Sequence, residues 1–136
     1  VLVACRAHPP APIARSLAEA GIGLLPLADP HDPLELAHAL GGYGFNEVLV
    51  EGGAHVHGAF LRAGLYDRLE LYLAPRTVGG GMAVAAGLGV STMAAGGRWA
   101  EESPARRLGD TWALTLARQD PEPAGSDAPT QQIVAP

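Results

Sequence analysis

EVLVEGGAHVHGAFLRAGLYDRLELYLAPRTVGGG, from Glu47 to Gly81, is the stretch that decides the expected fold. Its apolar beginning, Val48–Glu51, has the length and composition of a buried strand. Gly52-Gly53 follows, and Ala54–Ala63 predicts a helix that ends at Gly64. A strand, a glycine turn and a helix in this order present unpaired backbone N–H groups, which are suited to binding phosphate.

Strands and helices alternate on both sides of this stretch. Leu69, Leu71 and Leu73 alternate with arginine, glutamate and tyrosine, as is typical of a strand with one solvated face. Gly109-Asp110 separates two candidate strands and predicts an antiparallel hairpin. The other expected strands are Val1–Cys5, Gly23–Leu27, Arg68–Ala74, Pro104–Leu108 and Thr111–Ala117, and the other expected helices are Pro12–Ala20 and Asp32–Leu40. This order predicts an α/β fold of three layers, with a mostly parallel sheet and a C-terminal antiparallel hairpin.

The composition favours one domain followed by a tail. The chain has 136 residues, of which 48% are hydrophobic, enough for one core. We assign residues 1–118 to this domain. Gln119–Pro136 contains four prolines, three acidic residues and no basic residue, so it cannot bury enough apolar surface to fold. We therefore expect a disordered, Pro-rich acidic tail.

Charge and cysteine content exclude several classes of function. The net charge is −5 and the longest basic run is Arg106-Arg107, so nucleic acid is not an expected partner. All 9 basic residues are arginines, which excludes Schiff-base chemistry by lysine and a Walker-type phosphate loop. The single cysteine, Cys5, excludes an internal disulfide and favours a reducing cytoplasm. No secretory signal or membrane span is expected.

Glu51 and Gly52-Gly53 form the main candidate site. Glycine lets the backbone approach a ligand, and the helix N-terminus adds unpaired N–H groups and a partial positive charge. Glu51 would end a strand at the carboxyl edge of the sheet, where ligands bind in open α/β folds. Two plainer interpretations stay open: a β-α turn that needs glycine for its dihedral angles, and a solvated acid at a strand end.

Three neighbouring features are weaker candidates. His55 and His57 are two residues apart, which places them about 200° apart around a helix, so they cannot grip a metal ion together. One of them could still touch a cofactor. Gly79–Gly81 is either a ligand-facing loop or a simple connector. Arg76 is a phosphate contact only if it lies at the same edge as Glu51.

The motifs VLVEGG, GAFLRAGLYD, LELYLAP and VGGG between Val48 and Gly81 resemble the C-terminal reductase domain of the bifunctional riboflavin-biosynthesis deaminase/reductase. Arg107–Asp110 is similar to a hairpin near the end of that domain. The resemblance implies a dihydrofolate-reductase-like fold. It also implies NADPH-dependent reduction of 5-amino-6-(5-phosphoribosylamino)uracil, a small-molecule substrate, to the ribitylamino form.

The resemblance also implies roles for individual residues. Glu51 falls where the family contacts substrate. The cofactor would contact the turn and the start of the following helix, at Gly52, Gly53, Ala54, His55, Val56, His57, Gly58 and Ala59. No residue is assigned to catalysis and none to a metal. The expected assembly is a homodimer in the cytoplasm, with no membrane and no nucleic acid as partner.

Two alternatives to this enzyme stay open. One is a related dihydrofolate-reductase-like enzyme that reduces another pterin or pyrimidine, and the other is a non-catalytic remnant that only dimerises. The family's reductase domain has roughly another half-domain before the position of Val1, and the chain carries no zinc deaminase signature. We therefore expect an N-terminally truncated domain that is incomplete as a catalyst by itself. The coding sequence upstream of Val1 separates the enzyme from the remnant.

Overall fold

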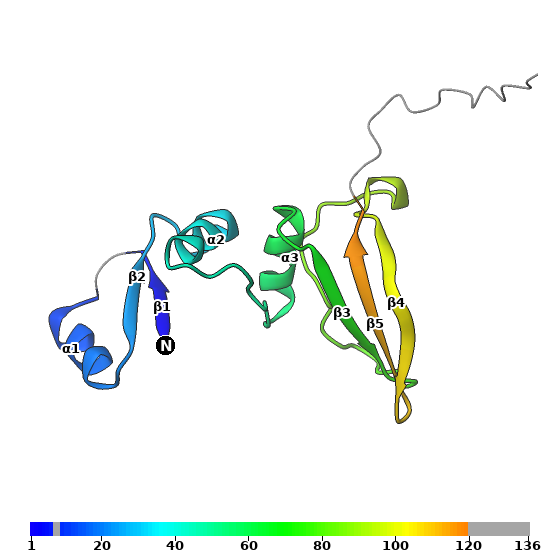
Figure 1. The fold of residues 1–136 in the computed structure, drawn as a ribbon, viewed down its shortest axis with the longest axis horizontal. Coiled ribbons are helices and arrows are strands. Elements are labelled where there is room, and N and C mark those ends of the chain that lie inside the picture. Colours follow the sequence, from blue (N-terminus) through cyan, green and yellow to red (C-terminus); the bar gives the residue numbers. More distant parts are fainter. Residues whose placement is uncertain (7–8, 120–136) are drawn as a thin grey trace, which may run out of the picture. The chain divides into compact units, whose positions relative to one another are not determined.

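The computed structural model describes residues 1–6 and 9–119, and these residues form two compact units (Figure 1). The first unit contains Val1–Tyr66 and Thr77–Val90. The second contains Asp67–Arg76 and the chain from Ser91 onward. Among the described residues, no helix combines the length and the apolar character needed to cross a bilayer.

The first unit begins with a short parallel sheet. Strand β1 (Leu2–Cys5) pairs with β2 (Gly23–Pro26), so that Leu2 lies opposite Gly23 and Cys5 opposite Pro26. Helix α1 (Ala11–Glu19) provides the crossover between the two parallel strands. Pro26 is the last residue of β2, where its missing amide N–H interrupts the sheet least. Leu25 in β2 and Leu27 just after it are buried, at 5% and 6% exposure.

Local capping signals set the bounds of the helices in this unit. Helix α2 (Pro33–Gly42) begins at Asp32, whose carboxylate accepts a hydrogen bond from the Leu34 amide at 2.9 Å. Helix α3 (Ala54–Arg62) is capped by the backbone of Gly53. It ends before Gly64, whose φ of +67° is a left-handed conformation that favours glycine. The predicted helices are therefore confirmed to within a few residues.

The second unit is an antiparallel sheet. Strands β3 (Arg68–Leu73), β4 (Trp99–Leu108) and β5 (Thr111–Arg118) lie in the order β3-β5-β4, and η1 (Met93–Ala95) is a short 3₁₀ turn before β4. Gly109, with φ of +66°, closes the β4–β5 hairpin, so the predicted hairpin is confirmed. Ala113 on the central strand β5 is 3% exposed.

Strand β4 begins five residues before the prediction, at Trp99 instead of Pro104. The pairing of β4 with β5 is irregular between Glu101 and Ser103 and again between Ser103 and Arg106. Pro104 lies in the second irregular stretch, where the missing amide N–H breaks no regular ladder. The proline therefore marks a bulge inside a long strand, and not the beginning of a short one.

The predicted strand Val48–Glu51 is wrong for the described chain. This segment has no regular secondary structure, and the side chains of Val48 and Leu49 are 50% and 79% exposed. An apolar run specifies an extended, buried segment only when a neighbouring strand supplies hydrogen-bond partners. The described strands therefore form a two-stranded parallel sheet and a separate three-stranded antiparallel sheet, not one mostly parallel sheet. The mixed α/β class is confirmed.

The predicted tail falls almost entirely outside the described residues, because Asp120–Pro136 is not described. Gln119 is the last residue with a described position. Its amide donates a hydrogen bond to the carbonyl oxygen of Arg98 at 2.9 Å. The described part of the second unit thus continues to the end of β5 and one residue beyond.

Candidate functional site

The N-terminus of α3 offers unpaired backbone donors. The carbonyl oxygen of Gly53 accepts hydrogen bonds from the amides of Val56 and His57, at 3.0 Å and 3.2 Å. Within the described residues, the amides of Gly53, Ala54 and His55 donate to no acceptor. Because the helix dipole adds partial positive charge here, these amides are suited to an anionic group.

The two glycines before α3 have different surroundings. A Cβ added at Gly52 would lie 3.2 Å from the Cβ of Val56, which is tight packing against the first turn of the helix. A Cβ added at Gly53 would meet no atom within 4 Å. Gly52 therefore lies close against Val56, whereas Gly53 has open space beside it.

Two of the predicted cofactor residues lie beneath another segment of the chain. Ala54 is 6% exposed, and its carbonyl oxygen accepts a hydrogen bond from the Ala86 amide at 2.8 Å. Gly58 is buried, and a Cβ added there would overlap the carbonyl oxygen of Ala86. These two positions contact the chain itself. Among the predicted cofactor residues on α3, the exposed side chains are therefore those of His55 and Val56 and, in part, His57 and Ala59.

His57 is held by an aromatic neighbour. Its Nδ1 lies 2.8 Å from the Tyr66 hydroxyl, and the ring of Tyr66 also contacts Phe60 with centroids 5.8 Å apart. Burial raises the pKa of Tyr66 above its usual value, so its hydroxyl keeps its proton at neutral pH. When Tyr66 donates to Nδ1, the neutral imidazole carries its own proton on Nε2. His57 can then donate a hydrogen bond to a bound molecule.

His55 is exposed, and it does not form a metal-binding group together with His57. Within the described residues, no group of three or more histidine, cysteine, aspartate or glutamate side chains is placed to hold a metal ion. That the histidines belong to a site without a metal ion stays a prediction. Their positions on α3 agree with the expected separation around the helix.

Glu51 lies just before the glycine turn, in the irregular segment, and not at the end of a strand. Its side chain is exposed, so its carboxylate can accept hydrogen bonds from an incoming molecule. Arg76 belongs to the second unit, where its guanidinium lies 4.0 Å from the carboxylate of Asp110. Gly79–Gly81 belongs to the first unit and is exposed.

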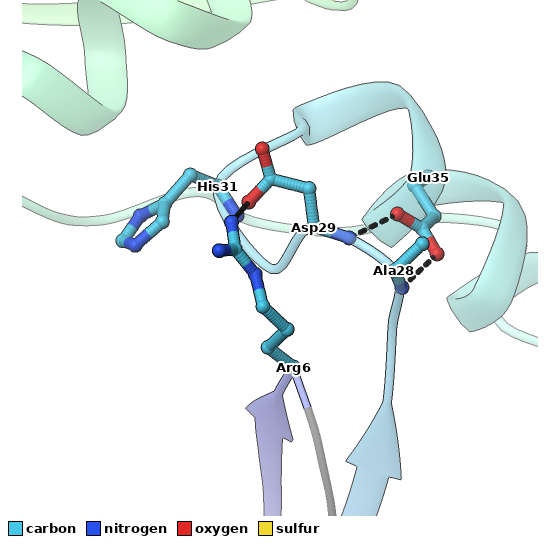
Figure 2. Close-up of polar contacts among 5 residues, drawn as sticks. All are labelled: Arg6, Ala28, Asp29, His31 and Glu35. Atoms are coloured by element: carbon cyan, nitrogen blue, oxygen red, sulfur yellow. Dashed lines mark hydrogen bonds and ion pairs between the residues drawn. The ribbon is translucent and has the colours of Figure 1, made fainter.

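A polar cluster at the carboxyl ends of β1 and β2 was not predicted (Figure 2). Arg6 follows β1, and its guanidinium contacts the carboxylate of Asp29 at 3.1 Å. The carboxylate of Glu35 accepts hydrogen bonds from the amides of Ala28 and Asp29, at 2.6 Å and 2.8 Å. The sequence signal was available, because polar residues that follow two parallel strands lie at the same edge of the sheet.

The charge of Asp29 is stabilised within this cluster. The His31 amide, which donates to Asp29 at 3.2 Å, and then the Arg6 guanidinium lower the pKa of the Asp29 carboxyl below its usual value. Glu35 meanwhile occupies the two amides that would otherwise be unpaired in the loop. The cluster therefore orders the connection between β2 and α2, and the backbone amides of Ala28, Asp29 and His31 are already paired.

The described elements define a mixed α/β domain in which a glycine turn opens a helix with unpaired amides. A model of the RibD C-terminal domain family matches residues 15–110. The chain therefore belongs to the RibD C-terminal domain family. The matched range includes the glycine turn, α3, β3 and the whole of β4.

Curated relatives agree with this assignment. The riboflavin biosynthesis protein RibD of Mycobacterium tuberculosis is 37% identical over 86 residues, which are 63% of this chain and 24% of that protein. RibD of Bacillus amyloliquefaciens is 47% identical over 49 residues, which are 36% of this chain and 13% of that protein. The chain thus spans at most about a quarter of the length of these relatives.

The structural comparison establishes the fold. Two solved structures of Acinetobacter baumannii RibD, forms 2 and 1, match with TM-scores of 0.68 and 0.69 at 24% sequence identity. The matches cover 87% and 88% of this chain and 31% of those chains.

Proposed function

We propose that the chain is part of an oxidoreductase of riboflavin biosynthesis that uses NADPH to reduce 5-amino-6-(5-phosphoribosylamino)uracil to its ribitylamino form. The observation that carries this proposal is the match of the RibD C-terminal domain family to residues 15–110, a range that contains Glu51 and the whole of α3. The dihydrofolate-reductase-like, three-layer arrangement and a cytoplasmic location are part of the same proposal.

The residues at the start of α3 fit a phosphorylated cofactor. The amides of Gly53, Ala54 and His55 have no acceptor in the described part of the chain, and Gly53 leaves open space beside them. A pyrophosphate group needs this combination of donors and close backbone approach. When bound, NADPH supplies the hydride for the reduction. The amides bind and orient the cofactor, and His55 and His57 are positioned to add side-chain donors.

Glu51 is proposed to position the substrate. Its exposed carboxylate precedes the turn that would hold the cofactor, and a carboxylate accepts hydrogen bonds from ring N–H, amino and hydroxyl groups. A substrate held beside the cofactor reacts faster because the two reactants no longer have to meet in solution. This role needs no metal ion.

Paired substitutions test the two halves of the proposal. We expect Gly53→Val to raise the NADPH dissociation constant at least ~10-fold, equivalent to about 1.4 kcal/mol, because the new side chain fills the open position. Gly41→Val is the matched control. A Cβ at Gly41 also meets no atom within 4 Å, but Gly41 lies on α2 and not at the proposed cofactor site. Unchanged NADPH affinity in a folded Gly53→Val variant would remove the cofactor assignment.

Glu51→Gln tests the substrate half in the full-length enzyme. We expect turnover of the ribosylaminopyrimidine to fall while NADPH affinity stays within about twofold, because the amide keeps the size of the side chain but loses the carboxylate charge. Loss of activity on treatment with a chelator would contradict a metal-free site. Reduction of another pterin or pyrimidine at a higher rate would favour the related reductase, and a full-length protein without reductase activity would favour the dimerising remnant.

A further inference from the structure

The glycine-rich segment Thr77–Val90 is attached to α3 through its second half. The amide of Ala86 donates to the carbonyl oxygen of Ala54 at 2.8 Å. From the other end of the helix, the Arg62 guanidinium donates to the carbonyl oxygens of Ala86 and Gly87, at 3.3 Å and 2.5 Å. One short piece of backbone is therefore bound by both ends of the same helix.

The surface of α3 is shaped to receive this backbone. Gly58 lies between Ala54 and Arg62, and a Cβ there would overlap the carbonyl oxygen of Ala86 and come within 2.9 Å of its carbon. Only glycine allows this approach without a shift of backbone. Gly87 also has a φ of +65°, a left-handed conformation that other residues adopt at a cost. We call this group, Ala54, Gly58, Arg62, Ala86 and Gly87, the Ala86 clamp.

Arg62 has a simpler possible role. A basic residue in the last turn of a helix stabilises that helix through the dipole alone. The acceptors of Arg62 are, however, carbonyl oxygens of the glycine-rich segment, 24 and 25 residues away in the sequence. A guanidinium that bonds two successive carbonyls fixes both their distance and their orientation. The contact therefore determines where the segment lies as well as stabilising α3.

The first half of the segment has no comparable attachment. A Cβ added at Gly79, Gly80 or Gly81 would meet no atom within 4 Å, and Gly80 has a φ of +77°. Within the described residues, no hydrogen bond from this triple-glycine loop to another element is present. The Ala86 clamp therefore holds the loop from its C-terminal side, a few residues away.

We infer that Arg62 is a positioning residue, which fastens the glycine-rich loop beside the helix that binds the cofactor. The inference rests on the proposed function, because it assigns the loop to the same cofactor site. Gly58, which the family resemblance places among the cofactor contacts, acts here as the surface on which Ala86 is seated. In this inference Arg62 acts through the loop, by its bonds to Ala86 and Gly87.

Hydrogen exchange tests the clamp without any cofactor. In Arg62→Met we expect the Ala86 amide to exchange at least ~10-fold faster. Without the two guanidinium hydrogen bonds, local opening of this segment costs less free energy. Arg62→Lys keeps a positive donor and should restore part of the protection. Arg15→Met, at an exposed arginine on α1, is the matched control and should leave Ala86 unchanged. Equal exchange of Ala86 in the parent and in Arg62→Met would overturn the clamp.

NADPH affinity tests the positioning role. We expect Arg62→Met to raise the dissociation constant several-fold at a temperature where the variant is fully folded, Arg62→Lys to lie between, and Arg15→Met to match the parent. Faster exchange at Ala86 with unchanged NADPH affinity would make Arg62 merely structural and overturn the inference. If the parent chain itself does not bind NADPH, the proposed function of this chain and the cofactor part of the inference both fall, while exchange still decides whether the clamp exists.

Gly58→Ala provides a second route to the same answer. The added methyl group should displace Ala86 and reproduce the faster exchange and weaker NADPH binding of Arg62→Met. Gly41→Ala is its control, because Gly41 is also helical and its added Cβ meets nothing within 4 Å. If Gly58→Ala does not fold, the arginine series alone decides. A folded Gly58→Ala chain with parental exchange at Ala86 would contradict the clamp.

Discussion

At the scale of single residues, Asp29 shows how one carboxylate orders a loop. Its carboxylate accepts hydrogen bonds from the His31 amide and the Arg6 guanidinium, and both contacts lower its pKa (Figure 2). A carboxyl whose pKa is lower in the folded than in the unfolded chain contributes stability that is present above the unfolded pKa and is lost as the pH falls through the folded pKa. Because Asp29 and Arg6 are exposed, salt weakens the part that comes from Arg6.

We predict that Arg6→Gln raises the pKa of Asp29 toward its usual value without abolishing the whole shift. The His31 amide remains as the larger cause, and only the guanidinium is lost. Titration of the Asp29 carboxyl carbon by NMR measures both values, and the parent should show a pKa below 3.8. High salt should move the parent toward Arg6→Gln. An Asp29 pKa that is identical in the two proteins would contradict a contact with Arg6 in solution.

At the scale of elements, glycines with the same open space have opposite roles. Gly21 follows α1 with a φ of +69°, whereas Gly41 lies within α2, and a Cβ at either position would meet no atom within 4 Å. The two glycines therefore differ in backbone conformation and not in the space available for a side chain. A left-handed residue with a Cβ costs about 1–2 kcal/mol, whereas alanine in a helix is favoured over glycine by about 1 kcal/mol.

We predict that Gly41→Ala raises the free energy of unfolding by about 0.5–1 kcal/mol and that Gly21→Ala lowers it by about 1 kcal/mol. Both substitutions restrict the unfolded chain equally, so the difference between them reports the folded backbone alone. Urea unfolding followed by circular dichroism measures both. Stabilisation by Gly21→Ala would show that α1 does not end in a left-handed turn.

At the scale of the whole molecule, much apolar surface is not buried by the chain itself. The buried hydrophobic residues in the described part are small in number: Leu25, Leu27, Ala54 and Ala113. Strand β1 pairs with β2 alone among the described strands, and Val1, Leu2 and Val3 are 91%, 38% and 38% exposed. An apolar strand edge pairs readily with another chain. We therefore propose that the isolated chain self-associates through the β1 edge.

We predict that the chain self-associates and that Val3→Lys shifts it toward the monomer, because a lysine on the edge strand opposes pairing. Sedimentation velocity over a range of concentrations measures the change. Ile13→Lys is the control, since Ile13 is 53% exposed but lies on α1. A parent chain that is monomeric at every concentration would contradict the proposal. Equal dissociation by Ile13→Lys would show that added charge, and not the β1 edge, controls association.

The sequence by itself determined the elements that depend on near neighbours. Asp32 with Pro33 set the start of α2, Gly21 and Gly64 set the ends of α1 and α3, and Gly109 set the hairpin. Each signal works through a few adjacent backbone groups, so no distant contact is needed. The open turn at Gly53 was predicted for the same reason.

Only the tertiary structure decided features that join distant residues. Val48–Glu51 has strand composition but is irregular, because a strand exists only where a partner strand completes its hydrogen bonds. Pro104 lies inside β4, because its partner β5 tolerates a bulge there. The family resemblance places Gly58 among the cofactor contacts. In the structure its surface is covered by Ala86, 28 positions later in the sequence, a close backbone approach that is a property of the folded chain.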